Sequence, residues 1–237
     1  MSLRPFLVLA GGACLTAACG KQQQPAQGAL LDTAKAAAMP AQIAADSGLL
    51  RADRSRIQGS ENARIWLVMA SDFQCPFCRA FHDDAYKQIV KNYVATGKVR
   101  VAFLNHPGAM HAHAVVSAEA AMCAGMQDHF WPMHDALFAT QNHWADLPDP
   151  QPVFDSLATS LRLDITDWRA CMTSHRTRPL ITADRAKSKA SGVDGTPTFF
   201  IANKLAIVGA QSYATFRAAL DSALAHAGPP SGGGQRP

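Results

Sequence analysis

The fold is decided by the stretch Asp72-Phe73-Gln74-Cys75-Pro76-Phe77-Cys78-Arg79, which lies between an apolar run and a helical pattern. Residues 64–70 are rich in strand formers and predict a strand that is buried on both faces. Pro76 suits the first position of a helix, where its missing N–H is not needed. We therefore expect a strand to end and a helix to begin at this motif.

The two cysteines of the motif have the spacing of a redox pair. At the start of a helix, Cys75 lies beside free N–H groups and the positive end of the helix dipole, which stabilise a thiolate. Because the thiolate is the form that attacks disulfides, we expect Cys75 to face solvent as the attacking sulfur. Cys78 follows one turn later, points inward and resolves the mixed disulfide.

Two other interpretations of Cys75 and Cys78 remain open. A structural disulfide of so short a span would remove little chain entropy, so stability is a weak reason for it. A zinc or copper site needs about four ligands, and the chain has no second C-x-x-C and no H-x-x-x-H spacing. His82, four residues after Cys78, could supply at most a third ligand. Redox chemistry is the interpretation that the pattern favours.

The pattern continues on both sides of the motif as an α/β fold. A helix is expected from Pro76 to about Thr96, ended by Gly97, and a second strand over residues 98–104. A strand, a helix and a strand in this order form a βαβ unit with parallel strands. The other predicted elements are a helical stretch over residues 109–191 with breaks at Pro132, residues 148–150 and Pro179, strands over residues 198–201 and 205–208, and a helix over residues 213–227 capped by Ser212.

A second informative segment is Val193-Asp194-Gly195-Thr196-Pro197-Thr198-Phe199-Phe200-Ile201, in which Gly195 permits a turn and Pro197 heads an apolar strand. With this segment, the chain resembles the DsbA-like branch of the thioredoxin superfamily, in which a helical domain is inserted between the two halves of the fold. The resemblance covers roughly residues 58–226. Its matching segments are Ser71 to Cys78, Gly195 to Phe200, Cys123-Ala124 and Phe130 to Phe138.

The resemblance implies a thioredoxin fold, βαβ plus ββα, with an inserted all-helical subdomain. It also implies that the bond between Thr196 and Pro197 is cis and that these two residues receive the client chain, and we expect Pro76 and Phe77 to contact the client as well. Exported proteins with thiols or disulfides would be the clients, and a membrane or periplasmic redox partner would recycle the enzyme.

The resemblance further implies a non-catalytic disulfide between Cys123 and Cys171, with two buried free thiols as the alternative. Two departures from the family pattern bear on the direction of electron flow. Met69 stands six residues before Cys75, where related enzymes often carry a buried acid. Phe77 offers the thiolate neither charge nor a side-chain donor, so we expect a less oxidising disulfide than in the strongest oxidants of the group.

The first residues predict export. Residues 1–18 combine one positive charge, an apolar stretch and small residues before Cys19, as secretory signals do. Leu15 to Gly20 resembles a bacterial lipobox, which implies that Cys19 is lipidated and that the protein lies in the periplasm. Gly20 after the cysteine implies attachment to the outer membrane. An ordinary secretory signal is the alternative. Without Cys14 and Cys19, four of the six cysteines remain, which suits two disulfides in an oxidising compartment.

Composition narrows the remaining possibilities. The 237 residues are 48% hydrophobic and 17% charged, which suits a globular chain. The net charge of +4 is not clustered, so nucleic acid is not expected as a partner. No apolar run reaches about 18 residues, so we expect membrane attachment only through the lipid. The predicted organisation is a signal peptide (1–18), a tether and N-terminal extension (19–57), a thioredoxin-fold domain (58–108 and 192–227), an inserted helical domain (109–191) and a disordered tail (228–237).

These patterns predict an exported thiol–disulfide oxidoreductase that acts as an oxidase through Cys75 and Cys78. A reductase or isomerase with the same residues, or a periplasmic copper- or zinc-binding protein, is the alternative. No cofactor and no metal are expected, because the disulfide itself carries the two electrons. Most of the histidines His106, His111, His113, His129 and His134 are expected at helix surfaces or partly buried, and a role as metal ligand is the alternative for any one of them. The core of the insertion is expected to hold Met110, Met122, Met126 and Met133.

Overall fold

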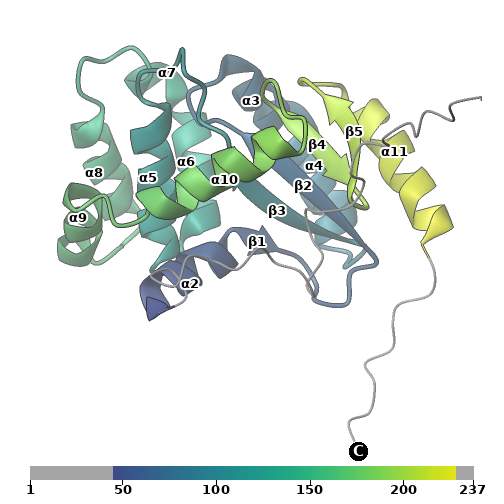
Figure 1. Ribbon diagram of the computed structural model, residues 1–237, viewed down its shortest axis with the longest axis horizontal. Coiled ribbons are helices and arrows are strands. Elements are labelled where there is room, and N and C mark those ends of the chain that lie inside the picture. Colours follow the sequence, from purple (N-terminus) through teal and green to yellow (C-terminus); the bar gives the residue numbers. More distant parts are fainter. Residues whose placement is uncertain (1–44, 228–237) are drawn as a thin grey trace, which may run out of the picture.

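The computed structural model describes residues 45–227, so the predicted signal peptide, Cys19, most of the tether and the tail lie outside the described residues. A five-stranded sheet with the order β1-β3-β2-β4-β5 forms its centre (Figure 1). The central strand β2 (Ile65–Ser71) runs parallel to β3 (Val99–Asn105) and antiparallel to β4 (Thr198–Ile201). At the two edges, β1 (Ile57–Gln58) pairs with β3 and β5 (Lys204–Val208) pairs with β4, both antiparallel.

The predicted thioredoxin fold is confirmed by this topology. β2, the helix that follows it and β3 form the parallel βαβ unit, and β4 and β5 form a hairpin followed by α11 (Tyr213–His226). Ala202 and Asn203 connect the hairpin with positive φ angles of 48° and 65°, as a two-residue turn between twisted strands requires. The side chain of Ser212 caps α11 by accepting from the Thr215 N–H at 3.4 Å.

Strand β2 is buried on both faces because apolar residues occupy both sets of alternating positions. Leu67 and Met69 point into the main core, which also holds Phe81 of the motif helix and Phe216 of α11. Val68 and Ala70, two positions apart on the opposite face of the strand, belong to a smaller apolar cluster. Both faces of the strand are therefore packed against apolar residues, and its last residue leads directly into the motif.

One helical run carries the motif from Pro76 to Val94. It consists of α3 (Pro76–Phe81), a π-helical segment η1 (His82–Tyr86), α4 (Lys87–Ile89) and a second π-helical segment η2 (Val90–Val94). Gly97 follows with a φ of 72°, which ends the helix as the sequence predicts. The π-helical segments were not predicted; each rotates the residues after it relative to a regular α-helix.

Six helices lie between β3 and β4. They are α5 (Ala114–Gly125), α6 (Phe130–Ala139), α7 (Gln141–Trp144), α8 (Gln151–Ser160), α9 (Ile165–Thr173) and α10 (Arg178–Ala190). Most of them pack beyond one end of the sheet, and α10 returns across it along β3 (Figure 1). The predicted break at Pro132 is wrong: Pro132 is the third residue of α6, in the first turn, where a missing N–H breaks no helical hydrogen bond.

One helix, followed by Arg56, packs onto the fold within the segment predicted as an N-terminal extension. Helix α2 (Ser47–Ser55) begins at Asp46, whose carboxylate accepts from the N–H groups of Gly48 and Leu49, and it buries Ala52 completely. Arg56, the residue after the end of α2, forms a buried ion pair with Asp184 of α10. None of the helices in the described part of the chain is long and apolar enough to cross a membrane.

Candidate redox site

The cysteine pair lies where β2 ends and α3 begins. Cys75 is the N-cap residue, with an extended backbone (φ −68°, ψ 123°), and Pro76 takes the first helical position. The Arg79 N–H donates to the Cys75 carbonyl at 3.2 Å, which closes the first turn. Both cysteines are free thiols in this structure. The motif therefore has the strand-to-helix placement that was expected from the sequence.

The two sulfurs differ in acidity. A hydrogen bond from the Cys78 thiol lowers the pKa of Cys75 to about 6, helped by the backbone N–H groups of Cys78 and Phe77 and opposed by burial. Burial raises the pKa of Cys78 well above its ordinary value, and its sulfur accepts from the Asp72 N–H at 3.5 Å. At neutral pH, Cys75 is therefore the thiolate and Cys78 holds the proton.

Cys75 does not face solvent as expected, because only 4% of the residue is exposed. The carbonyl oxygen of Thr196 lies 3.5 Å from its sulfur and accepts from the thiol form. From the helical insertion, the side-chain amide of Gln141 donates to the Cys75 carbonyl at 3.1 Å. Local sequence did not reveal this cover, because both contacts come from segments far along the chain. The next two residues, Pro76 and Phe77, are exposed.

The segment around Pro197 lies against the cysteines, and the bond between Thr196 and Pro197 is cis. Pro197 is buried, and its carbonyl accepts from the Gly209 N–H at 2.8 Å. The Thr198 hydroxyl donates to the Gly195 carbonyl at 2.7 Å. These bonds hold a short length of backbone beside Cys75, and they bring Thr196 and Pro197 together with the redox pair.

A buried carboxylate next to the pair was missed in the sequence. Met69 is buried in β2 and supplies no acid, but the Asp72 side chain, three residues later, is fully buried. Its Oδ2 accepts from the Gly108 N–H at 2.8 Å and from His111 Nδ1 at 2.6 Å, and its Oδ1 accepts from the Gln74 N–H at 2.8 Å. A single acid at the end of a strand that is buried on both faces was the available signal.

Gln74 connects the motif to two loops of the helical insertion. Its side-chain amide donates to the Ala145 carbonyl at 2.6 Å, and its Oε1 accepts from the His113 N–H at 2.5 Å. The His113 ring in turn donates from Nε2 to the Leu147 carbonyl at 2.7 Å. Gln74 therefore ties the loop before α5 and the loop after α7 to the residue that precedes Cys75.

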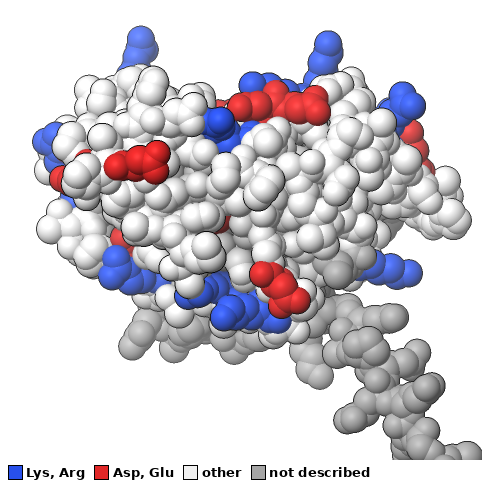
Figure 2. Space-filling model, turned by 90° about the horizontal axis from the view of Figure 1, so that it is seen from above, with Lys and Arg blue, Asp and Glu red and all other residues white. Residues whose placement is uncertain are grey.

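Apolar side chains are exposed in the motif and in the two loops that Gln74 ties to it. Phe77 is 65% exposed and Met110 is 95% exposed, so the expectation that Met110 fills the core is wrong. Leu147, on the second of the two loops, is exposed as well. Figure 2 views the molecule from the side of α3 and α7, at the top of Figure 1, and its charged side chains lie mainly around the margin of a broad uncharged area.

The other two cysteines in the described part of the chain lie in the helical insertion. Cys123 of α5 and Cys171 of α9 form a disulfide with an S–S distance of 1.96 Å and a Cα–Cα distance of 5.8 Å. Both residues are buried. The bond joins two helices of the insertion that are 48 positions apart in sequence at these cysteines.

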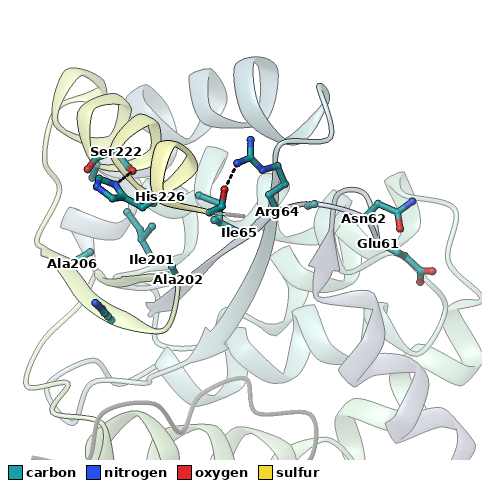
Figure 3. Close-up of a pocket in the computed structure, with 14 residues that line it drawn as sticks. Glu61, Asn62, Arg64, Ile65, Ile201, Ala202, Ala206, Ser222 and His226 are labelled. Carbon is teal, nitrogen blue, oxygen red and sulfur yellow. Dashed lines mark hydrogen bonds between the residues drawn. The ribbon is translucent and has the colours of Figure 1, made fainter. Parts of the chain in front are cut away.

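A cavity of about 670 Å³ lies at the opposite end of β2 from the cysteines (Figure 3). It lies between the start of β2, the β4–β5 hairpin and the end of α11. Arg64 donates to the Leu224 carbonyl at 2.8 Å, and His226 donates to the Ser222 carbonyl at 2.7 Å. None of the described residues that line this cavity is a cysteine.

One group of side chains has the composition of a metal site. The side chains of His82 and His134 approach the carboxylate of Asp135, and this group contains neither Cys75 nor Cys78. His134 is 1% exposed and is therefore an exception to the position expected for most of the histidines.

A family model described as Thioredoxin matches residues 51–222. The chain belongs to the thioredoxin family. Among curated proteins, this thioredoxin-family chain is 32% identical over 188 residues to the Na(+)/H(+) antiporter NhaA 3 of Salinispora tropica, a match that covers 78% of the chain and 27% of the antiporter. It is 22% identical over 156 residues to disulfide bond formation protein D of Bacillus subtilis, covering 63% of the chain and 68% of that protein. The chain thus spans only about a quarter of the antiporter's length.

Solved structures show the same fold. BdbD from Bacillus subtilis, in its oxidised form, superposes with a TM-score of 0.65 at 21% identity, covering 72% of this thioredoxin-family chain and 92% of BdbD. This match shows that the two chains share a fold.

Proposed function

We propose that the chain is an exported protein thiol–disulfide oxidase that donates the Cys75–Cys78 disulfide to client proteins. The observation that carries the proposal is the lowered pKa of Cys75, about 6, beside a Cys78 thiol whose pKa is raised. A sulfur that is stable as a thiolate leaves readily and stabilises the reduced pair, which favours giving the disulfide away. The printed name of the Bacillus subtilis relative, disulfide bond formation protein D, supports this direction.

The reaction needs two client thiols and the oxidised pair. A client thiolate attacks the Cys75 sulfur, the Cys75–Cys78 bond breaks, and Cys78 leaves and takes up a proton. A second client thiolate then attacks the client sulfur of the mixed disulfide and releases Cys75 as a thiolate. Two electrons pass from the client to the pair, so the client gains a disulfide and no further cofactor is needed. A membrane or periplasmic redox partner reoxidises the pair.

The same proposal assigns client binding to Thr196, Pro197, Pro76 and Phe77. Its support is the position of the Thr196 carbonyl, 3.5 Å from the Cys75 sulfur, and the 65% exposure of Phe77. An extended client backbone fits beside Thr196, while its apolar side chains contact Phe77. Unfolded exported proteins expose both features, and we take them as the clients.

The site of action in this proposal is the periplasm, with the chain attached to the outer membrane through a lipid on Cys19. Its support is the sequence pattern of residues 1–20. Replacing Cys19→Ser is expected to move the protein from the membrane fraction to the soluble fraction of the producing cells. An unchanged membrane fraction would contradict the lipid anchor and leave the thiol chemistry unaffected.

The direction of the reaction is tested by a redox titration of the mature chain in glutathione buffers, with thiol labelling read at Cys75 and Cys78. A midpoint well above the thioredoxin value of about −270 mV is expected. A midpoint near or below that value would make the chain a reductase with the same residues. The absence of a two-electron transition would remove the redox function altogether.

The roles of the two sulfurs are tested with a reduced, unfolded model client. Cys75→Ser should abolish disulfide formation in the client, whereas Cys78→Ser should accumulate a mixed disulfide between Cys75 and the client. The matched control is the double variant Cys123→Ala/Cys171→Ala, which lacks the other cysteine pair and should retain turnover. Activity that survives Cys75→Ser would refute the mechanism.

A further inference from the structure

Three side chains with metal-binding atoms meet between the helix that carries the motif and the helical insertion. His82 is the first residue of η1, and His134 and Asp135 are neighbours on α6. One ligand atom from each of the three lies within 4.8 Å of the other two. Asp135 Oδ1 lies 3.2 Å from His82 Nε2 and 2.8 Å from His134 Nδ1.

We propose that His82, His134 and Asp135 bind one zinc ion in this chain. Two imidazole nitrogens and one carboxylate oxygen form a donor set that zinc accepts in proteins, usually with a water as the fourth ligand. Zinc–ligand bonds of about 2.0–2.1 Å in a tetrahedron place neighbouring donors about 3.3 Å apart. The separations of 2.8 Å and 3.2 Å are close to this value, and the two histidine nitrogens lie within 4.8 Å of each other, so side-chain rotation would be needed to bring all three atoms onto one tetrahedron.

The hydrogen bonding of His82 supports a cation at this position. Its Nδ1 lies 3.1 Å from Asp83 Oδ1, while its Nε2 lies 3.2 Å from Asp135 Oδ1. Carboxylate oxygens therefore face both ring nitrogens, and a zinc ion between Nε2 and Asp135 would take the place of the contact on that side. The Asp83 contact is then the outer hydrogen bond to a carboxylate that metal-bound histidines generally make.

The surroundings hold the ligands and leave a path for the ion. His82 and His134 are 4% and 1% exposed, and the rings of Trp131 and Phe138 pack edge-on against His134 with centroids 4.9 Å and 5.0 Å away. The Asp135 side chain is 55% exposed, so ions and water reach the site from that side. Asp83 and Asp135 together supply two negative charges, which balance the charge of zinc.

This site differs from the cysteine-based zinc or copper site that the sequence left open. His134 and Asp135, which join His82 in this site, come from α6, about fifty residues further along the chain, and no cysteine takes part. A bound ion would join the motif helix, one turn after Cys78, to the helical insertion. The inference does not depend on the proposed oxidase activity, because it concerns binding and can be tested in either redox state.

The test is a calorimetric zinc titration of the full mature chain with Cys75 and Cys78 oxidised, so that their thiols cannot bind metal. One zinc per chain is expected. Asp135→Asn should weaken binding by at least about 100-fold, and Asp83→Asn, which loses only the outer hydrogen bond, by about 10- to 100-fold. The matched control is Asp84→Asn, an exposed carboxylate next to Asp83 that lies outside the cluster and should bind zinc as the parent does.

A second measurement reads the ligands directly in the unaltered chain. Cobalt(II) in place of zinc should give the visible bands of a four-coordinate nitrogen and oxygen site without sulfur charge-transfer bands, and the double variant Cys75→Ser/Cys78→Ser should give the same spectrum. The proposal is overturned if the oxidised chain binds no zinc, if Asp135→Asn binds it as tightly as the parent, or if the cobalt spectrum shows thiolate ligation. Loss of oxidase activity alone would leave it standing.

Discussion

At the scale of single residues, the redox pair has unequal acidities, and this predicts how its reactivity depends on pH. The alkylation rate of Cys75 in the reduced chain should rise with pH around a midpoint of about 6, since its hydrogen bond from Cys78 lowers its pKa to that value. Cys78, whose pKa burial raises, should stay unreactive at neutral pH. Mass spectrometry of the alkylated peptides measures both rates. A Cys75 midpoint at the ordinary thiol pKa near 8.5 would contradict the prediction.

The same shift affects stability. Folding lowers the pKa of Cys75 from its ordinary value to about 6, so the folded reduced chain releases this proton at a lower pH than the unfolded chain. The resulting stabilisation is present above the unfolded pKa and is lost as pH falls through about 6. The free energy of unfolding of the reduced chain should therefore rise with pH across this window, relative to that of the oxidised chain, where Cys75 does not titrate. Urea unfolding of both forms tests this, and parallel pH profiles would contradict it.

Asp72 is expected to hold the loop around Gly108 by accepting hydrogen bonds. Replacing Asp72→Asn places an N–H₂ group where donors from Gly108 and His111 now meet an acceptor. A buried donor left without an acceptor costs about 1–3 kcal/mol, which urea unfolding resolves. The exposed Asp146→Asn serves as the control and should leave stability unchanged. Equal stability of both variants would show that Asp72 has no such role.

Residue positions were harder to predict than residue chemistry. The cysteine spacing and Pro76 indicate a thiolate at a helix start, because both depend on local geometry. The cover over Cys75 comes from Thr196 and Gln141, which local patterns do not connect to it. Met110 illustrates the same limit, since an apolar residue in a loop carries no periodicity that separates core from surface.

At the scale of elements, strands were predicted almost to the residue because their apolar runs are unambiguous. β2 and β3 each lie within one residue of the predicted ranges. Pro132 misled the prediction, because a proline in the first turn of a helix and a proline that breaks one have the same local sequence. The two-residue strand β1 was missed, since Ile57 and Gln58 are too few to form a pattern.

The disulfide between α5 and α9 predicts an effect on the stability of the chain. Because it links positions 48 apart, its removal by Cys123→Ala/Cys171→Ala should lower the free energy of unfolding by about 2–5 kcal/mol. Urea unfolding of the variant and of the parent, both with the Cys75–Cys78 pair oxidised, measures the difference. An unchanged free energy of unfolding would show that the bond adds no stability.

At the scale of the whole molecule, one buried ion pair connects three parts of the chain. Arg56, between α2 and β1, lies 2.5 Å from Asp184 of α10, and its guanidinium also donates to the Phe103 carbonyl of β3 at 3.0 Å. Asp184 accepts from the side-chain amide of Asn105 at 2.7 Å as well. The N-terminal extension, the sheet and the insertion are therefore joined at one point.

Removing only one member of this pair should destabilise the whole chain. Arg56→Met leaves the Asp184 carboxylate buried without its partner, so we expect a loss of about 3–5 kcal/mol in urea unfolding. The double replacement Arg56→Met/Asp184→Leu should recover part of it, because the unpaired buried charge is removed while the buried N–H groups of Asn105 lose their acceptor. The exposed Arg51→Met on α2 is the control. A double variant as unstable as the single one would contradict this account.

The buried bond between Cys123 and Cys171 has a consequence for the cell that makes the protein. Cys123 and Cys171 are both buried in the folded chain, so the bond is made most readily while the newly made polypeptide is still open. If the protein is the disulfide donor that we propose, each new copy is also a substrate of the copies that are already folded. Copies already at work would then mature the next ones, and a cell starting with none would need an outside oxidant to begin the cycle.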